Sequence, residues 1–356
     1  MKKKIVAMMM MTVMAFSITA CGSGNATEKS NDTTPSAESQ DTTSKSNFKV
    51  TMITDTGGVN DQSFNQSAWE GLQMLKEKTG AEIGYLESVQ ESDYASNLDK
   101  QVDEDSDLIW GVGFALSEAV KEAAEVNDDV NFAIVDNAYE EVPENVTCVT
   151  FSAQDPSFLV GYVAGLTTET DKVGFIGGIS SEIIDQFEYG YRAGVAYAAK
   201  ELNKEITIDV QYADSFTDSA KGKAIGTTMY TNGCDIVFHA AAGVGIGLIE
   251  AAVEQGKYAI GVDSDQAYLA PENVLTSALK RVDVAVAEIS EKLAHGEKIG
   301  GQTFTYGLAD DGVGIPEENP NMDADIYAKA IALQEKVAAG EITVPYNAET
   351  LEAFHS

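Results

Sequence analysis

The chain has 356 residues, of which 57 are Asp or Glu and 23 are Lys or Arg, so its formal net charge is −34 at pH 7. This length suits two domains of ordinary size, each large enough to bury its own core. Such a charge argues against nucleic acid or an anionic lipid surface as a partner, because both are bound through basic patches. The acidity by itself indicates a solvated surface and identifies no cationic ligand.

The first twenty residues have the pattern of a secretory signal: Lys2–Lys4 precede an apolar run, residues 5–18, and small residues lead into Cys21. The run is short for crossing about 30 Å of hydrocarbon, which disfavours the alternative of an uncleaved membrane anchor. The residues before Cys21 resemble the lipobox of bacterial lipoproteins, which implies an acylated Cys21 on the extracytoplasmic face of the cell membrane. Residues 21–47, rich in Ser, Thr, Asn and Asp, predict a flexible tether.

From Phe48 onward, short apolar runs alternate with amphipathic stretches, and Asp155-Pro156 is expected to break the chain between two such series. Short strands alternating with longer helices predict parallel, doubly wound sheets, so the two series predict two Rossmann-like lobes. Strands are predicted at 49–54, 82–86, 108–112, 132–135, 146–151, 173–177, 207–213, 236–240, 259–262, 274–278 and 303–306. Helices are predicted at 65–79, 92–102, 116–126, 157–167, 184–201, 218–230, 245–255, 282–293 and 324–339, with a turn-rich stretch at 308–321.

The two series also suggest how the chain divides. We assign residues 48–153 and about 282–306 to an N-terminal lobe, and residues 154–281 and about 307–356 to a C-terminal lobe. Two α/β lobes hinged over a central cleft are the architecture of type I periplasmic binding proteins, which close around their ligand. A solute receptor is the simplest function for a secreted chain of this layout, although fold analogy alone does not determine function.

Polar residues concentrate in the loop after the first predicted strand. Asp55, Asp61, Ser63 and Asn65 all lie there, and Phe64 stands among them at the start of a helix. In an open α/β sheet this loop lies at the carboxyl ends of the strands, where ligands bind. Phe64 either packs against the helix start or presents an aromatic face to a flat ligand. Asn65 either contacts the ligand or caps its helix.

Phe187 occupies a similar position in the second series. Phe64 and Phe187 each precede a glycine, Gly71 or Gly194, by seven residues, with a small residue at the third position between them. Each also opens a helix that follows a strand. The repeated pattern predicts two half-sites whose rings face one another across the cleft, with ordinary core phenylalanines as the alternative.

Other motifs carry less information. Gly243 begins a glycine-rich turn that lacks the Lys-Ser/Thr ending of a P-loop, so it is weak evidence for phosphate; glycine there lets the backbone approach a ligand. Cys148 and Cys234 lie in apolar runs, so we expect buried free thiols, with a disulfide as the alternative. The three histidines have no metal-ligand spacing, and no catalytic Ser or Cys arrangement stands out, so neither a metal nor a cofactor is expected.

Taken in order, several motifs resemble the basic membrane protein (Bmp) family, over about Lys49 to Leu308. The resemblance implies a nucleoside-binding lipoprotein that serves as the solute receptor of an ABC importer with permease and ATPase partners. We expect a monomer without enzymatic activity. The motifs are Asp55-x8-Phe64-Asn65-Gln66-x2-Trp69-Glu70-Gly71, Gly177-Gly178, Phe187 and Gly194, Ala241–Gly245, Ile260–Gln266 and Thr276–Asp283.

The resemblance also implies roles for individual residues. Phe64 and Phe187 correspond to the rings that sandwich the base, and such stacking contributes about 1–3 kcal/mol for any base. Asp263 corresponds to the ribose ligand, although it could instead cap the turn that follows. Lys280, expected just past its strand, would donate to a ribose oxygen and balance Asp263, since an unpaired buried carboxylate is costly. Asp136 would accept an N–H from a purine.

The remaining implied contacts are polar. Asp55, Ser63 and Asn65 would contact the ligand from the first loop, Gly243 would donate its N–H to the ribose, and Asp61 is expected to be structural. Three carboxylates in the cleft would repel phosphate, which favours nucleosides over nucleotides, and purines are preferred on the resemblance. The open alternatives are a receptor for a sugar or signalling furanose, a nucleoside hydrolase, and a host-facing adhesin.

Overall fold

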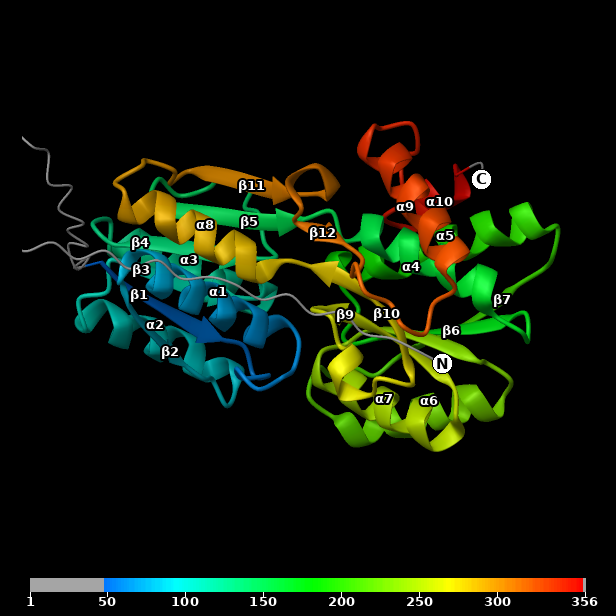
Figure 1. The fold of residues 1–356 in the computed structure, drawn as a ribbon. Helices are drawn as coiled ribbons and strands as arrows, with labels where there is room; N and C mark the ends of the chain where they lie inside the picture. Colours follow the sequence, from blue (N-terminus) through cyan, green and yellow to red (C-terminus); the bar gives the residue numbers. More distant parts are fainter. Residues whose placement is uncertain (1–47, 355–356) are drawn as a thin grey trace, which may run out of the picture. The chain divides into compact units, whose positions relative to one another are not determined.

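The computed structural model describes residues 48–354, which all belong to one unit of the chain, residues 43–356 (Figure 1). The predicted signal, the acylated Cys21 and the tether lie outside the described residues. Within them the predicted α/β class is confirmed, because two six-stranded sheets are each wound with helices. No helix among residues 48–354 is both long enough and apolar enough to cross a membrane.

The first sheet is wholly parallel and has the order β11-β5-β4-β3-β1-β2. Its strands are β1 Lys49–Thr54, β2 Glu82–Leu86, β3 Leu108–Val112, β4 Asn131–Val135, β5 Val146–Phe151 and β11 Gln302–Tyr306. The second sheet has the order β12-β10-β9-β8-β6-β7, and only β12 runs antiparallel to its neighbour. Its strands are β6 Lys172–Gly177, β7 Thr207–Tyr212, β8 Ile236–Ala240, β9 Tyr258–Asp263, β10 Val274–Lys280 and β12 Val313–Gly314.

Helices cover both faces of each sheet, as Figure 1 shows. Both faces of the strands are therefore buried, and their residues form continuous apolar runs. On β3, Trp110 packs toward α1 and α8 and its Nε1 donates to Ser290 Oγ of α8 at 2.9 Å, whereas Ile109 packs toward α2 and α3. The helices of this half are α1 Phe64–Thr79, α2 Tyr94–Asp103, α3 Ser117–Val126 and α8 Val282–Ala294.

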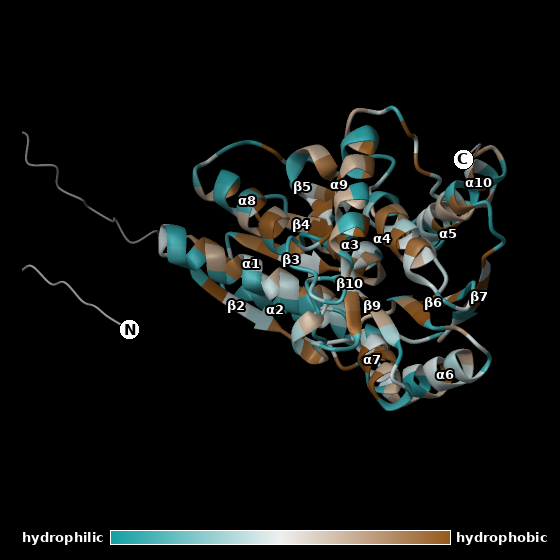
Figure 2. Cartoon of the chain, turned by 45° about the vertical axis from the view of Figure 1, so that its right-hand side comes forward, coloured by the Kyte–Doolittle hydropathy of each residue, from teal (hydrophilic) through white to brown (hydrophobic). Residues whose placement is uncertain are grey.

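The second sheet is covered in the same way. Phe175 of β6 packs into the cluster that contains α4 and α5, while the next residue, Ile176, packs toward α6 and α7. Figure 2 shows the consequence, with apolar strands inside and polar residues on the outer helical faces. The helices of this half are α4 Gln154–Thr167, α5 Glu182–Leu202, α6 Ser219–Thr231, α7 Gly243–Gln255, α9 Ala324–Ala338 and α10 Ala348–Glu352.

Several boundaries differ from the sequence predictions in ways that have a physical reason. The expected break at Asp155-Pro156 is wrong: α4 begins at Gln154, and a proline is tolerated in the first turn because its missing N–H has no partner there. Lys280 lies within β10 and not beyond it. One strand and one α-helix were not predicted, β12 and α10, because two to five residues are too few to show a hydrophobic period.

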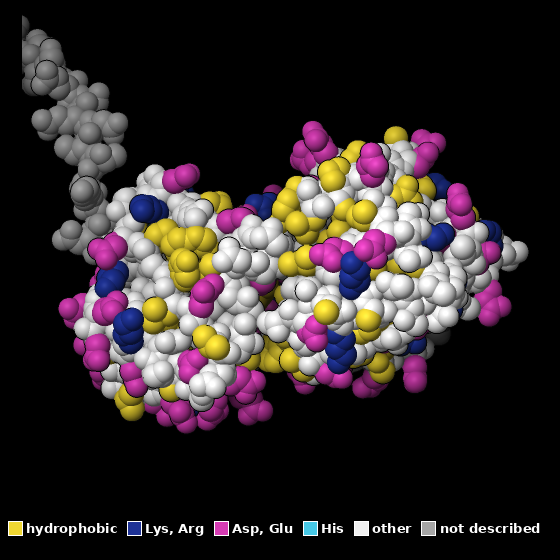
Figure 3. All heavy atoms as spheres, turned by 90° about the horizontal axis from the view of Figure 1, so that it is seen from below, with side chains coloured by type: hydrophobic (Ala, Val, Ile, Leu, Met, Phe, Trp, Pro, Cys, Tyr) yellow, Lys and Arg dark blue, Asp and Glu magenta, His cyan; other side chains and the backbone are white. Residues whose placement is uncertain are grey.

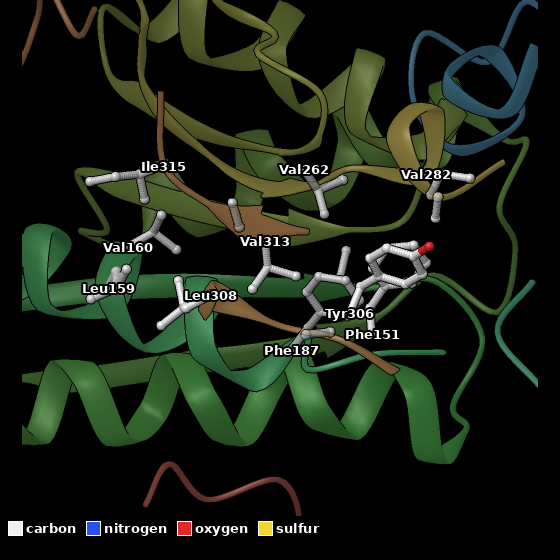
Figure 4. Close-up of a cluster of buried hydrophobic side chains, with 14 of the residues drawn as sticks. Phe151, Leu159, Val160, Phe187, Val262, Val282, Tyr306, Leu308, Val313 and Ile315 are labelled. Carbon is white, nitrogen blue, oxygen red and sulfur yellow. The ribbon is translucent and has the colours of Figure 1, made fainter. Parts of the chain in front are cut away.

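The chain crosses between the sheets three times, after β5, after β10 and after β11. β5 and β11 form one edge of the first sheet, and β10 and β12 form one edge of the second, so all three crossings lie beside these edges. An apolar cluster fills the junction: the rings of Phe151 and Tyr306 stack with centroids 5.7 Å apart, and Phe187 and Val313 lie beside them (Figure 4). The residue limits of the two lobes stay a prediction.

Two further sequence predictions can be read from the described residues. Cys148 of β5 and Cys234, just before β8, are both buried and both free, so the expectation of buried thiols is confirmed. Acidic side chains are spread over the face seen in Figure 3, where basic ones are fewer. The negative charge of the chain is thus carried at least in part by a solvated surface.

Candidate functional site

A cavity of about 210 Å³ lies where the carboxyl ends of strands from both sheets meet. From the first sheet it receives the loops after β1 and β3 and the end of β4. From the second it receives the start of α5, the loop after β7 and the ends of β8, β9 and β10. Carboxyl strand ends are the usual place for ligands in open α/β sheets, so this cavity is the candidate site.

Most of the predicted site residues line this cavity. Ser63 and Gly243 are not part of its lining: Ser63 lies behind it and donates its hydroxyl to Asp263, and Gly243 begins α7, directly after the lining residues Ala240–Ala242. The predicted residues that do line the cavity are Asp55, Phe64, Asn65, Asp136, Phe187, Asp263 and Lys280.

The first loop is held together by Asp61. Its carboxylate accepts the backbone N–H groups of Ser63 at 3.0 Å, Asn65 at 2.8 Å and Gln66 at 3.1 Å, so Asp61 caps the start of α1 and Asn65 does not. The Asn65 amide donates instead to Asp55 Oδ1 at 2.8 Å and to Asp61 Oδ2 at 3.0 Å. These two acceptors orient the amide, and its Oδ1 has no hydrogen-bond partner within the described chain.

Asp263 is the last residue of β9 and is 6% exposed. Burial raises its pKa to about 6, although the Lys280 charge and the hydrogen bond from Ser63 lower it. Burial also raises the pKa of Asp55 and of Asp61. Of these residues, Asp55 and Asp263 line the cavity, so it contains carboxylates whose charged form is poorly solvated. Such groups favour a ligand that supplies hydrogen-bond donors.

The two strand-end aspartates share an unusual backbone conformation. Asp136 has φ of 62° and Asp263 has φ of 63°, in the left-handed region that costs energy for residues other than glycine. Each turns the chain at the carboxyl end of its strand and directs a carboxylate into the cavity. This conformation is not confined to the cavity, because Asp105, Asp171, Asp214 and Asp311 also have positive φ.

Lys280 forms the charged centre of the cavity. Its side chain is 2% exposed, and its ammonium pairs with Asp136 across the two sheets. Lys280 was expected to balance the charge of Asp263, and its charge does lower the pKa of that carboxyl, but its ion-pair partner is Asp136 at the end of β4. The ammonium also lies over three rings, at 4.6 Å from the Phe64 centroid, 5.3 Å from Phe151 and 5.8 Å from Phe187.

Phe64 and Phe187 reach the cavity from the two halves of the fold. Phe64 is half-buried at the start of α1, while Phe187, in the first turns of α5, is 3% exposed. Both belong to the same apolar surface: Figure 4 shows Phe187 beside Phe151 and Tyr306, and Phe64 packs against that cluster. They therefore do not lie in separate cores, and each contributes ring surface to the cavity.

Sequence reasoning missed the apolar side of the cavity. Phe114 follows β3 and Phe216 follows β7, each a single aromatic in a loop directly after a strand. Phe64 was found as the one aromatic among polar loop residues, and Phe216, between Ser215 and Thr217, shares that signal, whereas Phe114 does not. Ile179, Ile183 and Ile184 complete this side, and Ile179 is 44% exposed.

Beside the cavity, a hydrogen-bond network joins the two halves. Gln266 Nε2 donates to the Gln62 carbonyl at 2.9 Å, and Tyr268 OH donates to Gln62 Oε1 at 2.7 Å. Gln266 Oε1 accepts the N–H of Val262 and lies 2.9 Å from His239 Nε2. Because an amide oxygen can only accept, His239 Nε2 is the donor in this bond. Burial lowers the pKa of His239 to about 4, which favours the neutral form of this histidine near pH 7.

Two further polar contacts lie outside the cavity. Arg281 pairs with Asp283, at 2.8 Å between Nη2 and Oδ2. Asp265 Oδ1 accepts the N–H of Ala267 at 3.0 Å, so Asp265 and not Asp263 caps the turn after β9. Across residues 48–354, no cluster of three or more His, Cys, Asp or Glu side chains is arranged to hold a metal ion.

Similarity to known proteins agrees with this geometry. A family model described as Bmp, ABC transporter substrate-binding protein PnrA-like, matches residues 48–348. Basic membrane protein A of Borreliella burgdorferi is 44% identical over 312 residues, which cover 86% of this chain and 90% of that protein. The ABC transporter nucleoside-binding protein BmpA of Lactococcus lactis subsp. cremoris is 40% identical over 325 residues, covering 85% of this chain and 90% of that protein.

Among solved structures, an ABC transporter solute-binding protein of Aeropyrum pernix K1 matches with a TM-score of 0.78 and 24% identity, covering 86% of this chain and 96% of that chain. That likeness confirms the predicted type I architecture of periplasmic binding proteins. At this sequence identity it supports the fold alone and not the function. The family model and the relatives extend over most of the chain. The chain therefore belongs to the Bmp family of PnrA-like substrate-binding proteins of ABC transporters, and it is a binding protein and not an enzyme.

Proposed function

We propose that this protein captures nucleosides, purine nucleosides above all, and delivers them to the permease and ATPase of an ABC importer. The observation that carries the proposal is one cavity that combines two phenylalanines from opposite halves of the fold with a buried Asp263 and a buried Lys280. A nucleoside consists of a flat, largely apolar base and a hydroxylated ribose, and these two kinds of surface match the two kinds of side chain.

The base would lie against Phe64 and Phe187. Stacking on an aromatic ring contributes about 1–3 kcal/mol per base and does not discriminate between bases. Discrimination would come from acceptors at the edge of the base. Asn65 Oδ1 has no partner within the described chain, and Asp136 keeps one carboxylate oxygen beyond its bond to Lys280. Two acceptors suit the N–H groups of a purine, and this supports the preference for purines.

The ribose would be held by Asp263 and Lys280. A carboxylate can accept hydrogen bonds from two neighbouring hydroxyls, and such charge-assisted bonds contribute about 1.5–3 kcal/mol each. Ser63 occupies one oxygen of Asp263 and thereby orients the group. Lys280 already pairs with Asp136, so it would donate a second hydrogen to a ribose oxygen without losing its counter-charge.

The charges of the cavity favour a neutral ligand. Asp55, Asp136 and Asp263 face the cavity, and Lys280 is the only basic side chain in its lining within the described chain. A phosphate would meet more negative than positive charge there. The proposal is therefore a nucleoside receptor, and it rests also on the relative from Lactococcus lactis that is named as nucleoside-binding.

The same proposal includes where the receptor works. The pattern around Cys21 supports a lipid anchor on the outer face of the cell membrane, and residues 22–47 would let the folded body reach the permease. A single acyl chain binds a membrane only marginally, so stable anchoring requires the several chains of a bacterial lipoprotein. Mass spectrometry of the protein extracted from membranes tests this by the mass of its N-terminal peptide.

The deciding experiment is calorimetry with the purified protein and a panel of ligands. Inosine, adenosine and guanosine should each release heat and raise the melting temperature, while ribose, free hypoxanthine and adenosine monophosphate should bind far more weakly. Binding of ribose alone with equal affinity would favour the sugar receptor instead. If no purine or pyrimidine nucleoside binds, the proposal is wrong.

A further inference from the structure

The ammonium group of Lys280 is buried with few polar partners. Its side chain is 2% exposed, and an ammonium carries three N–H donors. Among residues 48–354, its hydrogen-bond partner is the carboxylate of Asp136, while Asp263 is near enough for the Lys280 charge to lower its pKa. A charge removed from water is costly unless the protein replaces its solvation. One hydrogen bond replaces only part of it, so other groups must stabilise the rest of the charge.

Three aromatic rings surround this ammonium. Its Nζ lies 4.6 Å from the centroid of Phe64, 5.3 Å from that of Phe151 and 5.8 Å from that of Phe187, all within the range of a cation–π interaction. Phe64 and Phe187 line the cavity and are proposed to stack on the base, whereas Phe151 is not part of the lining. Phe151 is therefore the ring that remains available to the ammonium when a ligand occupies the cavity.

The ring of Phe151 is held in one orientation from behind. Phe151 ends β5 and lies opposite Tyr306, the last residue of β11, in the register of the first sheet. Their rings stack with an angle of 30° between the planes, and the Tyr306 hydroxyl donates to Glu288 Oε2 at 3.1 Å. Figure 4 shows the two rings next to Phe187. Both rings are buried and closely packed, so the face of Phe151 stays toward the ammonium.

A role in core packing alone is the alternative. Phe151 belongs to the large apolar cluster at the junction, in which any side chain of similar volume contributes buried surface. The attraction of a cation to a ring has a different origin, because it depends on the negative charge density over the ring face. The two roles therefore predict different effects when that charge density is removed and the volume is kept.

We infer that Phe151 is a positioning residue of the binding site, whose ring holds the Lys280 ammonium beside Asp136 and directed into the cavity. Phe151 does not line the cavity, so it acts on the ligand through Lys280. The inference rests on the proposed function for the ligand that Lys280 binds, but the contact between ring and ammonium does not depend on it. A lysine side chain has several rotatable bonds, and fixing its end in advance lowers the entropy lost on binding.

Replacing Phe151 by trifluorophenylalanine tests the contact without ligand, since fluorine withdraws charge from the ring face with little change in volume. In urea denaturation of the otherwise unchanged protein, the equilibrium constant for unfolding should rise roughly 3- to 10-fold, the size of one cation–π interaction. The same replacement in the double variant Lys280→Met with Asp136→Asn should have no effect, because the cation is gone.

The matched control is trifluorophenylalanine at Phe132, a fully buried ring of β4 that packs in a different cluster. Its effect on stability should be the same in both backgrounds. If trifluorophenylalanine at position 151 also changes stability equally in both backgrounds, Phe151 is only a packing residue and the inference is wrong.

Calorimetry with inosine tests the positioning role. Phe151→Leu keeps most of the apolar volume without a ring and should weaken binding about tenfold, and trifluorophenylalanine at position 151 should weaken it roughly threefold. Fluorination of Phe132 should leave the affinity unchanged. An affinity that fluorination of Phe151 does not change would overturn the inference, whatever the effect of Phe151→Leu. If the wild-type protein binds no nucleoside, the proposed function fails, while the comparison of the two backgrounds still decides whether Phe151 holds the ammonium.

Discussion

The two sides of the cavity are built on opposite principles. On the deep side, Lys280, Asp136 and Asp263 are almost fully buried and bonded to partners from the other half. On the outer side, Phe114, Phe216 and Ile179 are partly exposed and make only apolar contacts there. Buried polar groups are costly to leave unpaired, while exposed apolar contacts are weak and readily remade. The deep side therefore suits specific recognition, and the outer side suits repeated opening.

The largest effect should follow from breaking the deep ion pair. Lys280→Met leaves the Asp136 carboxylate buried without its partner, so the free energy of unfolding should fall by about 3–5 kcal/mol. Binding of inosine should be lost as well. Urea denaturation and calorimetry measure the two quantities.

The double variant Lys280→Met with Asp136→Asn separates these effects. Asparagine tolerates the positive φ of position 136 and removes the stranded charge, so most of the stability should return while binding does not. If the single Lys280→Met variant is as stable as the wild type, then leaving the Asp136 carboxylate unpaired costs nothing. The contrast between a deep polar side and an outer apolar side of the cavity would then be unsupported.

A smaller loss should follow from neutralising the proposed ribose ligand. Asp263→Asn keeps the shape of the side chain and tolerates φ of 63°, so the fold should remain intact. Inosine binding should weaken by about 1.5–3 kcal/mol, because charge-assisted bonds become ordinary ones. Asp265→Asn is the matched control, since Asp265 caps the adjacent turn outside the cavity. Equal affinities of the Asp263→Asn variant and the wild type for inosine would show that Asp263 does not bind the ribose.

The aromatic contribution should be similar or slightly smaller. Phe64→Ala should weaken binding of each nucleoside by about 1–3 kcal/mol with little preference between bases. Phe187 is a core residue, so Phe187→Leu is the better variant: it removes the ring while keeping most of the apolar volume. Calorimetry with inosine and uridine, with Phe304→Ala as control, checks both. A loss confined to one base would contradict stacking.

The smallest expected effect is a dependence on pH. The pKa of Asp263 is raised to about 6 by burial, so its carboxylate becomes charged as pH rises through 6. If the charged form holds the ribose, inosine affinity should fall by about tenfold between pH 7 and pH 5, and this dependence should be absent in Asp263→Asn. The stability of the unliganded protein should change in the opposite direction.

The opposite sign follows from linkage. Because the folded-state pKa of Asp263 lies above the unfolded value of 3.8, its contribution to stability is fully present below about pH 4 and is lost as pH rises through 6. Denaturation of the wild type and of Asp263→Asn at pH 5 and pH 7.5 isolates this contribution. Affinity and stability that change in the same direction would exclude a charged Asp263 as the ribose ligand.

The strands and the deep site were largely predictable from the sequence. Strand residues buried on both faces, such as those of β3 and β8, form continuous apolar runs that stand out from the helices around them. Asp55 directly follows β1, Asp263 ends β9, and Phe64 closes the loop after β1, so chain position alone indicates that they lie at the carboxyl ends of the strands. The order of these motifs also identified the family before the fold was known.

Pairing partners were not predictable in the same way. Lys280 was expected to balance the charge of Asp263, and its charge does lower the pKa of Asp263. Its ion pair with Asp136 was not predicted, and it forms because the two halves bring the end of β10 to the end of β4. The local sequence of neither residue indicates that the two are close. They are 144 positions apart, and only the tertiary fold brings them together. The contact between the rings of Phe114 and Phe216 depends on the same packing, since each is a single aromatic residue in its own loop.

The sequence by itself therefore determined the alternating α/β architecture, the edge at which a ligand would bind and most of the side chains available there. These features depend on hydrophobic period and strand order, which are local properties of the chain. Only the tertiary structure decided which carboxylate receives the ammonium, which amide oxygen stays without a partner and which two rings meet across the cavity. Those outcomes depend on distances between the two sheets, and such distances are set by packing across the junction.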